Sequence, residues 1–269
     1  KHRDRTARKM LKKLIQPFML CRIKAEVLDE LPPRTEVTLR IELSQAERNF
    51  YEALRQQALE NIENDRDQAV RQIRILAEIM RLRRACCHPK LVDESTETSS
   101  SKEQAFSDLV DELVGGGHRA LVFSQFTGHL ALLRQHLDGR GIRYCYLDGS
   151  TATAQRERQV KAFQSGAAPL FLISLKAGGL GLNLTAADYV IHMDPWWNPA
   201  VEDQAADRAH RIGQTRPVTV YRLVTVGTIE EKIVQLHHEK RDLAHSLLEG
   251  ADVSARIGLE ELLELIRGR

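Results

Sequence analysis

Residues 194–216 carry the side chains whose types and spacing point most clearly to chemistry. Asn198 as N-cap and Pro199 in the first turn predict a helix that runs to Ile212, where Gly213 can close it in a left-handed cap. Four polar side chains share one face of that helix, because they stand at offsets of zero, three, four and seven: Gln204, Asp207, Arg208 and Arg211. Guanidinium groups bind phosphate through paired N–H donors, so this face can hold a phosphorylated ligand. An exposed, salt-bridged helix face is the alternative, and the flanking sequence argues for phosphate.

These side chains need a scaffold, and residues from 102 onward alternate between strand and helix patterns. Short apolar runs separated by amphipathic helices predict an α/β fold, with a parallel sheet covered by helices on both faces. The predicted strands are 119–124, 143–147, 169–174, 189–193 and 218–224, and the predicted helices between them are 102–114, 128–137 and 153–163.

Polar residues follow the predicted strands at their carboxyl ends, where ligands bind in such sheets. They include Ser124 and Gln125, the turn 148–151, the segment 174–183 and Asp194 onward. The glycines in 174–183 either let backbone amides approach an anion or a ribose, or form a tight turn. The segment is neither a Rossmann fingerprint, because its spacing and position are wrong, nor a Walker A loop, because the chain has no Gly-Lys pair.

The first hundred residues predict appendages to this core. Residues 1–25 hold nine Lys or Arg against one acid on a helical pattern, which indicates a solvated basic face more than a phosphate contact. A strand over 35–43 precedes two long helices, 45–63 and 67–86, which form a hairpin that stands off the main body. The Ser-, Thr- and Glu-rich stretch 93–101 is expected to be a mobile surface loop.

Composition limits the class of protein. Hydrophobic residues make up 42% and charged residues 28% of 269 residues, the net charge is +2, and no apolar run could span a membrane. The four cysteines show no disulfide or zinc spacing, and Cys86, Cys87 and His88 are adjacent, so no metal site is expected. We expect a reduced, cytoplasmic protein. The chain begins without an initiator methionine, which suggests a fragment of a longer protein.

The ordered set of motifs resembles the second RecA-like lobe of the Swi/Snf-type ATPases of helicase superfamily two, prokaryotic members most closely. Any one motif is weak, whereas the set spans essentially the whole chain and is highly specific. The matching segments are Phe123–Phe126 (motif IV), Asp148–Thr151, Lys176–Asn183 (motif V), the linker Asp194–Pro199, Gln204–Gln214 (motif VI), and the landmarks Leu31–Pro33, Cys87–Val92 and Gly227–Lys232.

The resemblance implies a role for each matching residue. Arg208 and Arg211 correspond to catalytic arginine fingers that reach a triphosphate held by another lobe. Gln204, Gly179 and Gly181 correspond to positions near the nucleotide. Six residues correspond to positions that contact double-stranded DNA: Ser124, Gln125, Gly149, Ser174, Lys176 and Trp197. A core or interface aromatic is the alternative for Trp197, and position 175 is Leu where many relatives have Thr, so one DNA contact is in doubt.

The resemblance also shows what this sequence lacks. It has neither the Gly-x-x-x-x-Gly-Lys-Thr loop for the phosphates nor a strand-borne Asp-Glu-x-His for magnesium and water. We therefore expect half of a motor that cannot hydrolyse ATP alone, because ATP and Mg²⁺ are bound mainly by the N-terminal RecA-like lobe of the same protein. A DNA-bound protein is a further expected partner. If this protein is prokaryotic, we expect it to be associated with the nucleoid. Two alternatives remain, a stand-alone module that binds nucleic acid or protein, and a lobe of an RNA helicase.

The expected organisation has five parts. They are a basic helix and connecting strand (1–43), a helical protrusion (44–92), the mobile loop (93–101), the RecA-like core (102–226), and a brace helix with a C-terminal tail (227–269).

Overall fold

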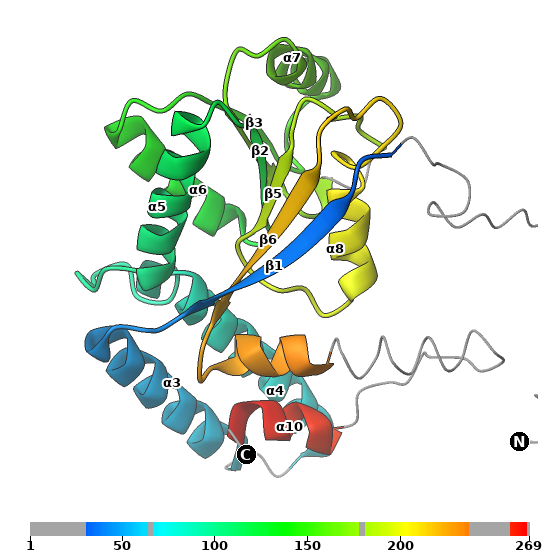
Figure 1. Cartoon of the computed structure of the whole chain (residues 1–269). Helices are drawn as coiled ribbons and strands as arrows, with labels where there is room; N and C mark the ends of the chain where they lie inside the picture. The colour runs from blue at the N-terminus through cyan, green and yellow to red at the C-terminus, as the bar shows by residue number, and fades with distance from the viewer. Residues whose placement is uncertain (1–30, 64–66, 178–180, 237–258, 268–269) are drawn as a thin grey trace, which may run out of the picture. The chain divides into compact units, whose positions relative to one another are not determined.

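The computed structural model describes residues 31–63, 67–177, 181–236 and 259–267 (Figure 1). The described residues from Pro32 onward belong to one compact unit. The predicted basic helix in 1–25, Gly179 and the later part of the brace helix lie outside the described residues. No helix of the described parts is long and apolar enough to cross a bilayer.

Six strands form one sheet in the order β1-β6-β5-β2-β4-β3, and every neighbouring pair is parallel. This arrangement confirms the predicted parallel sheet. The strands are β1 (Arg34–Ile41), β2 (Ala120–Ser124), β3 (Tyr144–Leu147), β4 (Leu170–Ser174), β5 (Tyr189–His192) and β6 (Val218–Thr225).

Two apolar clusters cover the two faces of the sheet because successive strand residues point to opposite sides. In β2, Leu121 and Phe123 belong to one cluster, whereas Ala120 and Val122 belong to the other. Helices α5 (Ser101–Gly115) and α6 (Thr127–Gly139) cover the second face, and α7 (Thr153–Gln164) and α8 (Pro199–Ala206) cover the first (Figure 1). The buried residues on both faces explain why β2 and β4 read as continuous apolar runs.

The strand that precedes the helical pair joins the core sheet. All eight residues of β1 pair in register with β6, from Arg34 opposite Val218 to Ile41 opposite Thr225. An ion pair between Arg34 and Asp203 of α8 also ties the strand to the helix (2.7 Å). Strand β1 therefore forms an edge of the sheet.

The predicted helical pair is α3 (Gln45–Glu63) and α4 (Gln68–Cys87), which pack against each other. The predicted capping box opens α3, because the backbone N–H of Ser44 donates to Glu47 (2.9 Å) and the backbone N–H of Glu47 donates to the Ser44 hydroxyl (3.3 Å). Helix α10 (Leu259–Arg267) and helical residues 229–236 complete an apolar cluster with this pair (Figure 1). A short helix, η2 (Pro89–Leu91), follows α4.

The prediction of one helix from Pro199 to Ile212 is wrong, because α8 ends at Ala206. The next backbone N–H groups, from Arg208 and Ala209, bond three residues back, which tightens the chain into turns. The carbonyl oxygen of Arg208 accepts a bond from Leu184 N–H (3.0 Å), a partner far away in sequence. Gly213 does adopt a positive φ of 96°, within these turns rather than at the end of the helix.

Candidate nucleotide and nucleic-acid interface

Arg208 and Arg211 lie in the turns after α8, and neither forms a salt bridge with any residue that the structure describes. Arg208 is only 7% exposed, and its Nε atom has no hydrogen-bond partner there. Burial lowers the pKa of the Arg208 guanidinium, and the positive charge of Arg211 lowers it further, against a smaller opposite effect of Asp207. Two neighbouring cations without a carboxylate between them would be stabilised by an anion.

Of the three other residues expected near a nucleotide, Gly179 lies outside the described residues, and Gln204 and Gly181 are exposed. Gln204 lies on α8, whereas the arginines follow that helix, so helical spacing no longer places all three on one face. Gly181 adopts a positive φ of 71°, and the space that a Cβ atom would occupy is open. Glycine is favoured at this position because of its positive φ, and not because a side chain would clash with a neighbour. The open space around Gly181 leaves its backbone accessible to a ligand.

A buried amide that the sequence analysis missed fixes these turns. The Nε2 group of Gln214 donates to the carbonyl oxygens of Ala187 (2.7 Å) and Ala209 (3.0 Å), and contacts that of Thr185 (3.1 Å). Its Oε1 atom accepts from the backbone N–H groups of residues 215 and 216. Gln214 therefore joins the loop before β5 to the segment that carries the arginines. Its place inside motif VI was the available signal.

Two of the predicted DNA-contacting residues, Gln125 and Lys176, line one pocket of about 400 Å³. The first turn of α6 also lines it, and the N-cap of that helix, Phe126, supplies no side-chain hydrogen bond to the first N–H groups. Arg84 of α4 brings a second cation to the same pocket. The lining residues are Met80, Arg84, Leu91, Gln125, Phe126, Thr127, Gly128, Lys176 and Trp196.

Arg83 holds the wall of this pocket in place. It is buried, and its guanidinium donates to the Gln125 side chain (3.1 Å) and to the carbonyl oxygen of Pro195. The same guanidinium lies over the rings of Trp196 (5.9 Å) and Trp197 (5.2 Å). Trp196 lines the pocket, whereas Trp197 packs against the apolar cluster that includes α3, α4 and α10. These surroundings are those of an interface aromatic, which is the alternative to a DNA contact for Trp197.

The remaining predicted DNA contacts differ in exposure. Ser124 and Ser174 are buried, and the Ser124 hydroxyl donates to Asp194 (2.5 Å), so it positions that carboxylate. Gly149 is exposed in a turn organised by Asp148. Burial raises the pKa of Asp148, but hydrogen bonds from Ser150, Tyr146 and Thr151 outweigh it and lower that pKa to about 2. Gly149 thus stays accessible next to a fixed negative charge.

The sheet and the arrangement at its strand ends define a RecA-like lobe of the helicase type. Residues 101–213 match the family model described as the helicase conserved C-terminal domain, and residues 1–91 match the SNF2-related domain. The chain belongs to the SNF2 (Swi/Snf) family of helicase-related ATPases, and the structure is that of its C-terminal RecA-like lobe.

Curated relatives come from bacteria and eukaryotes. An uncharacterized ATP-dependent helicase of Mycoplasma pneumoniae is 38% identical over 95% of this chain and 25% of its own length. The human SWI/SNF-related matrix-associated actin-dependent regulator of chromatin subfamily A member 1 is 36% identical over 94% of this chain and 26% of its own length. The chain therefore spans about a quarter of the length of these relatives.

Solved structures agree with the family. The Sulfolobus solfataricus SWI2/SNF2 ATPase core in complex with dsDNA is 30% identical with a TM-score of 0.72, over 97% of this chain and 56% of that one. The C-terminal domain of the Sulfolobus solfataricus ATPase is 27% identical with a TM-score of 0.71, over 88% of this chain and 99% of that one.

Proposed function

We propose that this chain is the C-terminal motor lobe of an ATP-dependent translocase on double-stranded DNA. It supplies Arg208 and Arg211 to a nucleotide whose triphosphate and Mg²⁺ are held mainly by the N-terminal RecA-like lobe of the same protein. The observation that carries this proposal is a buried Arg208 guanidinium with no carboxylate partner among the described residues, next to the exposed Arg211. A phosphate that arrives from another lobe would supply the missing negative charge.

The second part of the proposal concerns the DNA. The pocket at the carboxyl edge of the sheet combines Lys176 and Arg84 with the start of α6. Cations and helix N-termini contact the phosphate backbone independently of base sequence, which suits a protein that moves along DNA. Support also comes from the similar Sulfolobus solfataricus core, which was solved in complex with dsDNA.

The mechanism follows from two separate ligand sites. ATP bound between the lobes draws them together through the arginines, and hydrolysis releases them. Each cycle then moves one DNA-binding site relative to the other. The chain has no Gly-Lys pair for a Walker A loop, so this lobe alone is expected to show no ATPase activity. A DNA-bound protein is the proposed object of the movement.

Comparison of nucleic acids in an ATPase assay tests the proposed function. The full-length protein is expected to hydrolyse ATP faster with duplex DNA than with an RNA duplex of the same sequence and concentration. Steady-state phosphate release over a titration of each nucleic acid measures the difference. Equal or greater stimulation by RNA would favour the RNA helicase alternative, and stimulation by neither would contradict a nucleic-acid motor.

Replacement of Lys176 by alanine tests the DNA-binding pocket. We expect weaker binding to duplexes of any sequence, because the side chain neutralises a phosphate rather than reading a base. The slope of log K against log salt should fall by about one. Fluorescence anisotropy of labelled duplexes over a series of salt concentrations measures both effects.

Lys161→Ala is a matched control, because Lys161 is an exposed lysine on α7 and does not line the pocket. This variant should keep the wild-type slope. Equal slopes for Lys176→Ala and the wild type would remove Lys176 from the DNA interface.

A further inference from the structure

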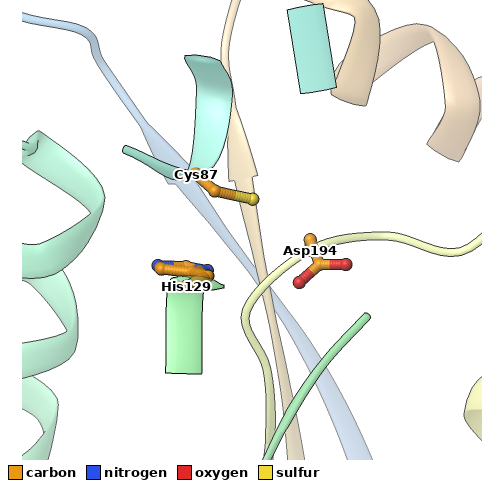
Figure 2. Close-up of side chains that lie close together, drawn as sticks. All are labelled: Cys87, His129 and Asp194. Carbon is orange, nitrogen blue, oxygen red and sulfur yellow. The ribbon is translucent and has the colours of Figure 1, made fainter. Parts of the chain in front are cut away.

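Cys87, His129 and Asp194 bring a thiol, an imidazole and a carboxylate together from three separate elements (Figure 2). Cys87 is the last residue of α4, His129 belongs to the first turn of α6, and Asp194 follows β5. One possible ligand atom from each residue lies within 4.8 Å of the other two. The residues are 0%, 0% and 3% exposed, respectively, so the cluster lies inside the protein.

The imidazole of His129 lacks partners. A neutral imidazole has one N–H donor and one acceptor nitrogen. Neither ring nitrogen of His129 has a hydrogen-bond partner in the part of the chain that the structure describes, although both are shielded from solvent. Two unpaired polar atoms in an interior are costly, so the imidazole points to a ligand that the described residues do not supply.

The carboxylate of Asp194 is held in position for such a ligand. One oxygen accepts from the Ser124 hydroxyl (2.5 Å), and the other accepts from the backbone N–H of Gln125 (3.2 Å). Each oxygen has a second lone pair, so it can still bind an ion. Hydrogen bonds of this kind commonly orient carboxylates that bind metals. Cys87 is a free cysteine, so its sulfur is available as well.

The charges around the cluster allow a divalent cation. A thiolate and a carboxylate together balance two positive charges. The nearby Lys102 ammonium is neutralised by Glu230, with Nζ–O distances of 2.6 and 2.7 Å. Burial raises the pKa of Asp194, and the positive charge of Arg83 on α4 acts in the opposite direction with a smaller effect. A divalent ion at this position would cancel the two negative charges of the thiolate and the carboxylate.

We propose that Cys87, His129 and Asp194 bind one Zn²⁺ ion. Sulfur, nitrogen and oxygen ligands together are typical of zinc, whereas Mg²⁺ and Ca²⁺ take oxygen ligands. Zinc–ligand distances of about 2.0–2.3 Å require the three atoms to approach one another by roughly 1 Å, which side-chain rotation can supply. A water molecule is the proposed fourth ligand.

The ion would have a structural role. It would fasten the end of α4 in the helical protrusion to the start of α6 in the sheet domain and to the segment 194–199. That segment leads to α8, and Asp194 also binds the backbone of Gln125 in the pocket. Zinc would therefore stabilise the position of the protrusion relative to the pocket wall.

Metal content and spectroscopy of the chain test the site. The chain is first freed of metal with a chelator, then incubated with excess ZnSO₄ and dialysed. Elemental analysis should then find one zinc per molecule. CoCl₂ in place of zinc should produce a thiolate-to-cobalt charge-transfer band in the near ultraviolet. Zinc should also raise the midpoint of thermal unfolding by several degrees.

The adjacent cysteine gives a matched control. Cys86 is also buried but lies outside the cluster, so Cys86→Ala should keep the zinc and the cobalt band, whereas Cys87→Ala should lose both. His129→Gln provides a second variant if Cys87→Ala does not fold. Wild-type chain that retains less than about a tenth of an equivalent of zinc would overturn the proposal. Equal zinc and cobalt signals in the Cys86 and Cys87 variants would overturn it too.

Discussion

Replacement of Arg208 or Arg211 by alanine in the full-length protein is expected to lower kcat for DNA-stimulated ATP hydrolysis by about 10³–10⁵-fold. Charge develops on the transferring phosphoryl group, and a guanidinium that reaches it from the second lobe stabilises the transition state more than bound ATP. Because both side chains lack a carboxylate partner among the described residues, their removal breaks no salt bridge found there. The loss should therefore appear in kcat rather than in folding or DNA affinity.

Arg216→Ala is the matched control for this measurement. Arg216 lies in the same segment and is an exposed arginine, but it pairs with Asp188 (3.2 Å). This variant should keep ATPase activity within about twofold, because buried Asp188 keeps its bonds to His118 (2.7 Å) and to the backbone N–H of Arg119 (3.0 Å) when Arg216 is removed. Arg208→Lys separates charge from geometry, since lysine keeps the charge but lacks the planar fork. Retention of activity within twofold by both alanine variants would refute the arginine-finger assignment.

The sheet was predictable because the sequence of each strand carries its own local pattern. Ala120–Phe123 and Leu170–Ile173 are apolar on both faces, and only a parallel sheet covered on both sides buries such runs. The capping box at Ser44 likewise depends on residues three apart, and α3 begins where it indicates. Patterns that are satisfied within one element could be read from the sequence alone.

The end of α8 was not predictable, because it depends on partners far away in sequence. Nothing between Pro199 and Ile212 disfavours a helix by local propensity. The chain leaves the helix where Arg208 accepts a hydrogen bond from Leu184 and where Gln214 binds Ala209. These bonds exist only after the loop before β5 has packed against the turns, so tertiary contacts override propensity.

The candidate sites show the same division. Motif spacing identified Gln125 and Lys176, which the structure brings to one pocket. It gave no sign that Arg83 would lie beneath both tryptophans, because that contact joins segments more than a hundred residues apart. The cluster of Cys87, His129 and Asp194 leaves no mark in local cysteine and histidine spacing, because its three members belong to separate elements.

A buried ion pair connects the helical residues 229–236 to the core, and its disruption is expected to have the largest effect on stability. Lys102 is fully buried, and its ammonium donates to both carboxylate oxygens of Glu230 and to the carbonyl oxygen of Met193 (2.9 Å). Burial alone would lower the pKa of Lys102, but the charge of Glu230, the neighbouring Cys87 and Cys86 and the hydrogen bond to Glu230 together outweigh burial and raise that pKa. All three ammonium hydrogens are thus used. Because each ammonium hydrogen has an acceptor, Lys102 can remain charged in the interior of the protein.

Lys102→Met should therefore lower the free energy of unfolding by about 3–5 kcal/mol, because Glu230 would remain as a buried charge without its partner. Urea denaturation followed by circular dichroism measures the change. The double variant Lys102→Met/Glu230→Gln should recover a large part of the loss, since it leaves no unpaired charge. Arg48→Met is the surface control, because Arg48 and Glu42 form an exposed pair whose loss should cost less than about 1 kcal/mol. If Lys102→Met cost no more than Arg48→Met, the pair would not be what fastens residues 229–236 to the sheet domain.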